Sequence, residues 1–294
     1  MTTRPVYRPK LTRPFYTAEN VEFEWANGQS ASTKQKNSLR LREEFHKKHP
    51  NLSVLEVSTK SDSPAGVALS PFNLSLRVPS LRKAFPVEVL YQGSKTFRHG
   101  GPYVDLYGMA PQDTLHDPRF SDSGELLGFT FEKRMYPAKP DFLFYVWLYI
   151  LALLENQGSA EVVKKTDAFC DIEFNPQTGM NNQAKACAIF HSLSQLGLLD
   201  QVRDFDRFQK IMMAQQLPQD FVQSGKSDAP AKLDDLRSEK KRTPFKVGDW
   251  LYHPSIGRGE VIRKNADGYL VKFNISGPRT LTKDYVEFHC KKIK

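Results

Sequence analysis

The sequence predicts an α+β protein: a mainly helical domain that contains short strands, followed by a small all-β barrel at the C-terminal end. Three observations predict this fold class. An almost unbroken apolar run at residues 142–154 indicates a buried central helix, and a stretch nearly without apolar residues at 217–243 indicates a flexible linker. After the linker, five short strand-like runs separated by turn signals lie at residues 249–253, 259–264, 269–274, 280–282 and 286–289.

The chain divides into four expected parts. Residues 1–20 are expected to form a basic extended arm, because the segment "MTTRPVYRPKLTRPF" has four cations, no acid and three prolines, which exclude a regular helix. The main domain is expected at 21–216, the linker at 217–243 and the β-barrel at 244–294.

Strand and helix patterns alternate along the main domain. Alternating apolar residues predict strands at 21–25, within 52–61, within 69–78 and at 124–129. Helical periodicity predicts helices at 31–49, 87–97, 140–156, 181–199 and 205–216. We expect Ser32 or Thr33 to cap the first helix, and Asn181 or Asn182 to cap the fourth. The expected buried side chains of the first helix are Leu39, Leu41 and Phe45.

The distribution of charge suggests a partner with a phosphate backbone. The net charge is +9; residues 1–50 and 243–294 each have ten cations against five acids, which leaves the middle near neutral. Clustered cations at two ends favour a nucleic acid, because binding releases its counterions. Ordinary solvated charge without a ligand is the alternative interpretation.

Other features favour a soluble cytoplasmic protein without a metal or cofactor. No apolar run reaches the length of about 20 residues that spans a bilayer, and the N-terminus does not resemble a signal peptide. Three scattered cysteines fit a reducing compartment and have no zinc spacing. His99, His116 and His191 also lack metal-ligand spacing, and we interpret them as structural or surface residues.

The stretch "PVEVLYQGSKTFRHGGPY" at 86–103 contains polar residues at positions i, i+3, i+4 and i+7, namely Glu88, Tyr91, Gln92 and Lys95. On a helix they would share one face, with the first and last about 10.5 Å apart. This span suits a group of the size of a ribose. The alternative is two solvated charges and a partly buried tyrosine.

Three segments together resemble the signature of the NADAR family of YbiA-like ADP-ribose N-glycosidases. They read LSPFN at 69–73, PVEVLYQGSKTF at 86–97 and DAFCDIEF at 167–174, and the resemblance extends over residues 20–215. The family has Trp and Gly where this chain has Cys170 and Asp171. The phrases "LEVSTKS", "GGPYVDLY" and "DAFCDIEFNP" resemble the branch found beside DarT-type toxins, which ADP-ribosylate DNA bases.

The resemblance implies an antitoxin-like enzyme that removes ADP-ribose from guanine in DNA, with single-stranded DNA as the expected form. The bond that breaks is N-glycosidic, and its transition state has oxocarbenium character. Glu88 would be the general acid/base. Lys95 would form a Schiff base at C1″ of the ribose or bind a phosphate as a point charge.

Further candidate residues for ADP-ribose binding follow from the same motifs. Each also has an ordinary structural explanation as a polar turn, a helix cap or a solvated residue. The candidates beside Glu88 and Lys95 are Ser58, Thr59, Lys60, Asn73, Tyr91, Gln92, Gly100, Gly101, Tyr103, Asp171, Glu173 and Asn175. Among them, the two glycines would permit close approach of a pyrophosphate, and the two acids would hold ribose hydroxyls or a base edge.

The C-terminal segment resembles the SH3-like (Tudor-like) tail of UvrD-type helicases and CarD-type modules. The matching pieces include VGD at 247–249, GRGEV at 257–261 and VKF at 271–273. Such modules bind RNA polymerase or DNA. Candidate nucleic-acid-binding cations are Arg258, Arg263, Lys264 and Lys272.

Two other functions remain open from the sequence. A NADAR enzyme acting on small N-ribosides, such as riboflavin-pathway intermediates, would not need the two basic ends. A non-catalytic adaptor for DNA or RNA polymerase would tolerate Glu88→Gln. A neighbouring DarT-type toxin gene would favour the DNA-directed enzyme, with the toxin as its functional partner.

Overall fold

The computed structural model describes residues 1–174, 181–213, 245–253, 257–265, 268–274, 277–282, 286 and 290–293. The described chain falls into two units. The first contains residues 1–93, 104–117 and 139–213, and the second contains residues 94–103, 118–138 and the described residues from 245 onward. The linker predicted at 217–243 lies outside the described residues.

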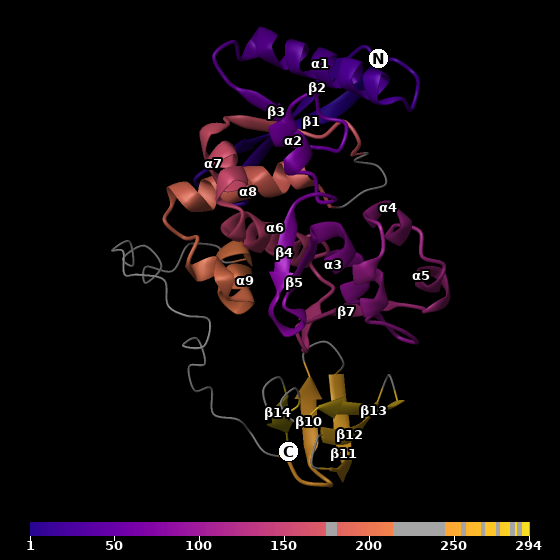
Figure 1. The fold of residues 1–294 in the computed structure, drawn as a ribbon. Coiled ribbons are helices and arrows are strands. Elements are labelled where there is room, and N and C mark those ends of the chain that lie inside the picture. The colour runs from indigo at the N-terminus through magenta and orange to yellow at the C-terminus, as the bar shows by residue number, and fades with distance from the viewer. Residues whose placement is uncertain are drawn as a thin grey trace. The chain divides into compact units, whose positions relative to one another are not determined.

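A four-stranded sheet in the order β2-β1-β9-β3 organises the first unit. Its strands are β1 (Thr2–Pro9), β2 (Tyr16–Phe23), β3 (Val54–Glu56) and β9 (Ala168–Cys170). β1 pairs antiparallel with β2 along its whole length, whereas β3 and β9 run parallel. Helix α1 (Ala31–Lys48) covers one face, and α8 (Gln183–Gln195) covers the other (Figure 1).

The basic arm expected at residues 1–20 is part of this sheet. These residues are extended, but they form paired strands, because β1 lies between β2 and β9 in the strand order. The prolines exclude a helix, as predicted, yet a strand accepts them where no ladder N–H is required.

Helix α1 begins at residue 31, as predicted, but its N-cap is not one of the two expected residues. Ser30, and not Ser32 or Thr33, is its N-cap, and the Ser30 hydroxyl accepts a hydrogen bond from the Thr33 N–H at 3.2 Å. Leu41 and Phe45 are buried against the sheet, as predicted. Leu39 is 48% exposed, because it lies two positions from Leu41 and therefore on the opposite side of the helix.

The predicted central helix is α6 (Leu143–Glu155), in which ten side chains are buried. It packs on α8. The N-cap of α8 is Asn182, one of the two predicted capping residues, and the Asn182 side chain accepts a hydrogen bond from the Lys185 N–H at 2.8 Å. The remaining long helices of this unit are α7 (Gln157–Lys165) and α9 (Phe205–Met213).

Short elements complete the first unit around α3 (Val87–Ser94), which begins directly after a two-stranded sheet. They are α2 (Pro64–Ala68), β4 (Ser75–Val78), η1 (Pro79–Leu81), β5 (Lys83–Pro86), η2 (Val104–Gly108), α4 (Pro111–Thr114) and η3 (Gln201–Arg203).

The second unit contains two antiparallel sheets. One has the order β6-β7-β8 and includes the strand predicted near 124–129; its elements are β6 (Lys95–Phe97), β7 (Leu126–Phe131), β8 (Arg134–Pro137) and the neighbouring helix α5 (Arg119–Asp122). The other is C-terminal, with the order β13-β12-β11-β10-β14. Its strands are β10 (Trp250–His253), β11 (Gly257–Lys264), β12 (Gly268–Phe273), β13 (Gly277–Thr282) and β14 (Lys291–Ile293).

The prediction of a C-terminal barrel is wrong, because β13 and β14 are the edges of an open sheet. Four of its five strands were predicted within a few residues of their bounds. The fifth was expected at 286–289, but the observed fifth strand is β14, and 287–289 lie outside the described residues. Within the described chain, no helix combines the length and apolar character needed to cross a membrane.

Candidate active site

A cavity of about 620 Å³ lies in the first unit. Cavities of this volume are typical of sites for small molecules and cofactors. Its lining residues are Ser58, Thr59, Ser70, Pro71, Phe72, Glu88, Tyr91, Gln92, Leu115, His116, Tyr145, Asp171, Glu173, Phe174, Asn181 and Gln183. Seven of the residues predicted to bind ADP-ribose or to catalyse, Glu88 among them, are thus brought together from three separate segments.

Helix α3 directs a carboxylate and an amide at this cavity. Its first turn is fixed by a hydrogen bond from the Glu88 N–H to the Pro71 carbonyl at 3.0 Å. Glu88 and Gln92 are one turn apart, and Gln92 Nε2 donates to Glu88 Oε1 at 2.6 Å. Both side chains are less than 10% exposed. Because a buried carboxylate requires a hydrogen-bond partner, Gln92 holds Glu88 in a defined position in the cavity wall.

Tyr91 is the third polar residue of α3 in the cavity wall. Its ring meets Tyr145 of α6 edge to face, with 5.3 Å between the ring centroids. Burial raises the pKa of Tyr91 to about 12, and the nearby charge of Glu88 acts in the same direction. The phenol is therefore neutral near pH 7 and can donate a hydrogen bond.

Two cavity residues carry buried side-chain oxygens without a partner in the described part of the chain, Gln92 Oε1 and Asn181 Oδ1. Unsatisfied buried acceptors are rare in folded proteins, and each calls for an explanation. Both atoms accept hydrogen bonds only. A ligand rich in hydroxyl or amino groups would supply the missing donors.

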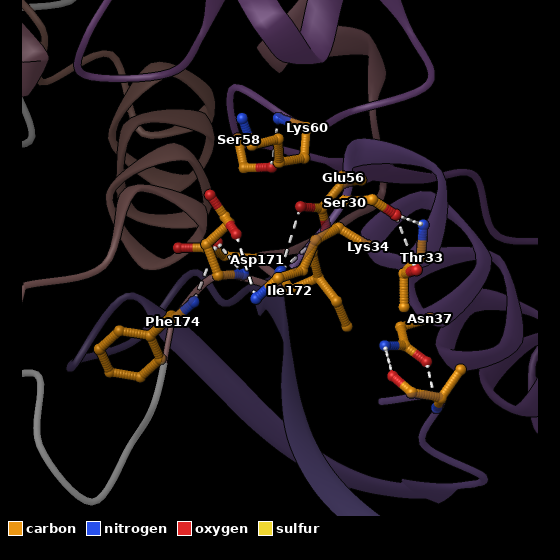
Figure 2. Close-up of polar contacts among 12 residues, drawn as sticks. Ser30, Thr33, Lys34, Asn37, Glu56, Ser58, Lys60, Asp171, Ile172 and Phe174 are labelled. Carbon is orange, nitrogen blue, oxygen red and sulfur yellow. Dashed lines mark hydrogen bonds and ion pairs between the residues drawn. The ribbon is translucent and has the colours of Figure 1, made fainter. Parts of the chain in front are cut away.

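Two buried carboxylates hold the turn that forms another wall of the cavity. Glu56, at the end of β3, accepts the Ile172 N–H with both oxygens, at 3.1 and 3.2 Å. Asp171 accepts the N–H groups of Glu173 at 2.9 Å and Phe174 at 3.2 Å. Figure 2 shows both carboxylates directed at the backbone of this turn.

The burial of this pair changes its protonation. Burial raises the pKa of Glu56 to about 7, and it raises the pKa of Asp171 well above its usual range. The charge of Glu56 is the second cause of the shift in Asp171, because two nearby carboxylates disfavour simultaneous ionisation. The pair therefore retains protons at a pH where exposed carboxylates are ionised.

The three binding candidates at 58–60 have in part a structural role. Ser58 and Thr59 line the cavity, whereas Lys60 does not belong to its lining. The Ser58 hydroxyl accepts the Lys60 N–H at 3.1 Å and is hydrogen-bonded to Glu56, so it supports the buried carboxylate (Figure 2). Asn73 also lies outside the lining; its Nδ2 donates to the Val67 carbonyl at 2.8 Å.

The helix expected to continue through Lys95 ends at Ser94, and Lys95 begins β6. The expectation of a four-residue stripe on one helix is therefore wrong for its last member. Lys95 is paired with Phe129 of β7 in the strand register. Its Nζ lies 4.5 Å from the centroid of the Phe120 ring, a cation–π contact within the second unit.

Gly100 and Gly101 have local packing reasons for lacking a side chain. A Cβ on Gly100 would collide with the hydroxyl groups of Tyr103 and Ser123, and one on Gly101, which has φ +81°, would collide with the Lys95 carbonyl. Tyr103 in turn is hydrogen-bonded to Ser123. The two glycines end no helix, since α3 ends at Ser94, and their role towards pyrophosphate stays a prediction.

Sequence reasoning missed part of the site. Glu56 gave one usable signal, an acid inside an apolar strand pattern, which indicates a buried functional or paired group. His116, which we interpreted as a structural or surface residue, is exposed, and it is also one of the residues that line the cavity. Asn175 lies outside the described residues. In the described chain, no cluster of His, Cys, Asp and Glu has the arrangement of a metal site.

The family described as "DarT1-associated NADAR antitoxin" matches residues 2–221 of this chain. The chain belongs to this family. A search of curated proteins gives no significant match. The matched NADAR range contains the complete lining of the cavity, whereas the C-terminal sheet lies beyond it.

Proposed function

We propose that this NADAR protein is an ADP-ribosyl-DNA glycohydrolase that removes ADP-ribose from guanine bases and so counteracts a DarT1-type toxin. Family membership supports the antitoxin role and ADP-ribosylated DNA as its substrate. The observation that carries the proposed chemistry is the buried Glu88–Gln92 pair in the wall of a cavity within the matched range. The unpartnered oxygens of Gln92 and Asn181 favour a hydroxyl-rich ligand such as ribose.

The reaction needs one group that both gives and takes a proton. Over the whole reaction, water forms a bond to C1″ and loses a proton, and the bond from C1″ to the base nitrogen breaks as the departing guanine gains one. A single carboxyl can serve both steps, because it is regenerated after each turnover. Its negative charge also stabilises the oxocarbenium-like transition state. Glu88 has this role in our proposal, and Tyr91 donates to a ribose oxygen.

Lys95 is not among the residues that line the cavity, and it is the second catalytic residue of the proposal on the basis of the sequence motif. Its neutral amine would form a bond to C1″ and lose a proton as the bond to the base breaks. The bond from C1″ to the ring oxygen would then break as that oxygen gains a proton, which leaves a cationic Schiff base until water adds to C1″ and releases the lysine. The Phe120 ring beside Nζ would stabilise that cation as it does the ammonium. The alternative role is a phosphate-binding charge, which needs only a cation.

Substitution of Lys95 separates these two roles. We expect Lys95→Arg to be as inactive as Lys95→Ala, because arginine retains the charge but forms no Schiff base. Borohydride added during turnover should link ADP-ribose to the wild-type protein and to neither variant, as seen by intact-protein mass spectrometry. If Lys95→Arg retains most of the activity and nothing is trapped, Lys95 binds a phosphate instead.

The function itself is tested with single-stranded DNA that carries ADP-ribose on guanine. The wild-type protein should release free ADP-ribose and unmodified DNA, and chromatography with mass detection measures both products. A small N-riboside serves as the comparison substrate. Failure to hydrolyse the modified DNA would overturn the proposal. Turnover of the riboside alone would mean that the substrate is a small molecule.

A further inference from the structure

The outer face of the C-terminal sheet carries two exposed aromatic side chains. Successive side chains of a strand point to opposite faces. On β10, Leu251 is buried in the cluster that forms the inner face, whereas its neighbours Trp250 and Tyr252 are 39% and 43% exposed. These two rings therefore lie on one face, about 6.7 Å apart along the strand.

The strand register places cations beside these two rings. Arg258 is the cross-strand partner of Tyr252, and Lys272 is the partner of Glu260, which in turn lies opposite Trp250. Arg258 and Lys272 are exposed, and each alternates with buried residues of the inner face. The register also places one acid, Glu260, between Trp250 and Lys272 on this face.

The register also separates the other two cations that the sequence suggested. Arg263 lies opposite Leu270 and follows the bulge after Val261, so it joins the outer face. Lys264 lies opposite Tyr269 and belongs to the inner face. Its Nζ is 5.2 Å from the centroid of the Tyr269 ring and donates to the Phe245 carbonyl at 3.2 Å.

We propose that this outer face binds single-stranded DNA, with Trp250 and Tyr252 stacked on bases and with Arg258, Lys272 and Arg263 in contact with phosphates. Every base offers a π-face, so exposed aromatic rings on a sheet bind single strands without reading their sequence. Three outer cations against one acid complement a phosphate backbone, and residues 243–294 carry a net charge of +5.

A nucleic acid fits this surface better than a protein does. The centre of a protein–protein interface is depleted in charged residues. Here each aromatic ring lies opposite a charged residue of β11, Glu260 or Arg258, whereas the register places apolar Ile293 of β14 on the other side of Trp250. This inference does not rest on the proposed glycohydrolase activity, because the sheet lies outside the matched family range.

Binding of the full-length protein to an unmodified, labelled thymidine oligomer of about 16 nucleotides tests the proposal by fluorescence anisotropy. The combined variant Trp250→Ala/Tyr252→Ala should weaken binding at least tenfold. Trp250→Phe/Tyr252→Phe should restore most of it, since stacking needs only an aromatic ring. This second variant separates stacking from any loss of folding.

The outer cations and a matched control complete the test. Arg258→Ala/Lys272→Ala should reduce the slope of log affinity against log salt by about 1.4, the value for two lost phosphate contacts. Lys246→Ala removes an exposed cation outside the strands and should leave the affinity within about twofold of the wild-type value.

Three results would overturn the inference. They are failure of the wild-type protein to bind the oligomer at low salt, equal binding by Trp250→Ala/Tyr252→Ala, and tighter binding of an RNA oligomer of the same length. Because the probe carries no ADP-ribose, an inactive enzyme that still binds it would count against the proposed function alone.

Discussion

Glu88→Gln should lower the initial rate of ADP-ribose release about a thousandfold, within the range lost when a general acid–base residue is removed. Glutamine has the same shape, and its carbonyl oxygen can still accept the hydrogen bond from Gln92 Nε2, so the cavity wall keeps its geometry. The amide can neither take a proton from water nor give one to the departing base. Rates measured on ADP-ribosylated single-stranded DNA provide the comparison.

Glu44→Gln is the matched control for this prediction. Glu44 lies on α1 and is not among the residues that line the cavity; it forms an ion pair with Lys47 at 2.7 Å, and its side chain is 39% exposed. We expect its substitution to change the rate by less than about twofold, because exposed ion pairs contribute little. Equal losses in both variants would show that removal of a carboxylate in general, and not proton transfer by Glu88, explains the effect of Glu88→Gln.

The parts of the fold that the sequence predicted well depend on local patterns. The thirteen apolar residues at 142–154 cannot be exposed to water, and α6 follows from them directly. Asn182 caps α8 because its short side chain reaches the N–H groups of the first turn. Glu88 and Gln92 meet because residues four apart on a helix are neighbours.

The parts of the fold that the sequence did not predict depend on strand partners that are distant in the sequence. Residues 1–20 form strands because β1 pairs with β2 along its whole length and with β9 at Val6 and Tyr7, and local composition cannot indicate the second pairing. Lys95 leaves the helix because it pairs with Phe129 of β7, across a long connection. In both segments tertiary pairing overrides the local preference.

Glu56 illustrates the same limit within the candidate site. Its carboxylate binds the backbone of Ile172 only because β3 runs parallel to β9, with Glu56 opposite Cys170. The thiol of Cys170 also donates to Glu56 Oε2, at 3.3 Å. An acid within an apolar strand indicated that something unusual was buried, but the register was needed to identify its partner.

Protonation of Glu56 should make the folded protein more stable in mild acid than in mild base. Burial raises the pKa of Glu56 to about 7 from 4.5, so between these values the folded state holds more protons than the unfolded state. Stability therefore falls as pH rises from about 4.5 to about 7, and it levels off above that. The raised pKa of Asp171 acts in the same direction, whereas the charge of Arg42 opposes the shift in Glu56.

Glu56→Gln should remove much of this dependence. A neutral amide can still accept the Ile172 N–H, but its burial carries no penalty for ionisation, so the variant should match the wild type near pH 5 and melt several degrees higher near pH 8. Thermal unfolding followed by circular dichroism at both values measures this difference. Glu43→Gln, which neutralises an exposed acid on α1, should keep the wild-type dependence of melting temperature on pH.

A wild-type melting temperature that rises between pH 5 and pH 8 would mean that the buried pair is ionised in the folded state. The turn at 171–174 would then be held by charged carboxylates, whose stronger hydrogen bonds to backbone N–H groups would have to offset the cost of burial.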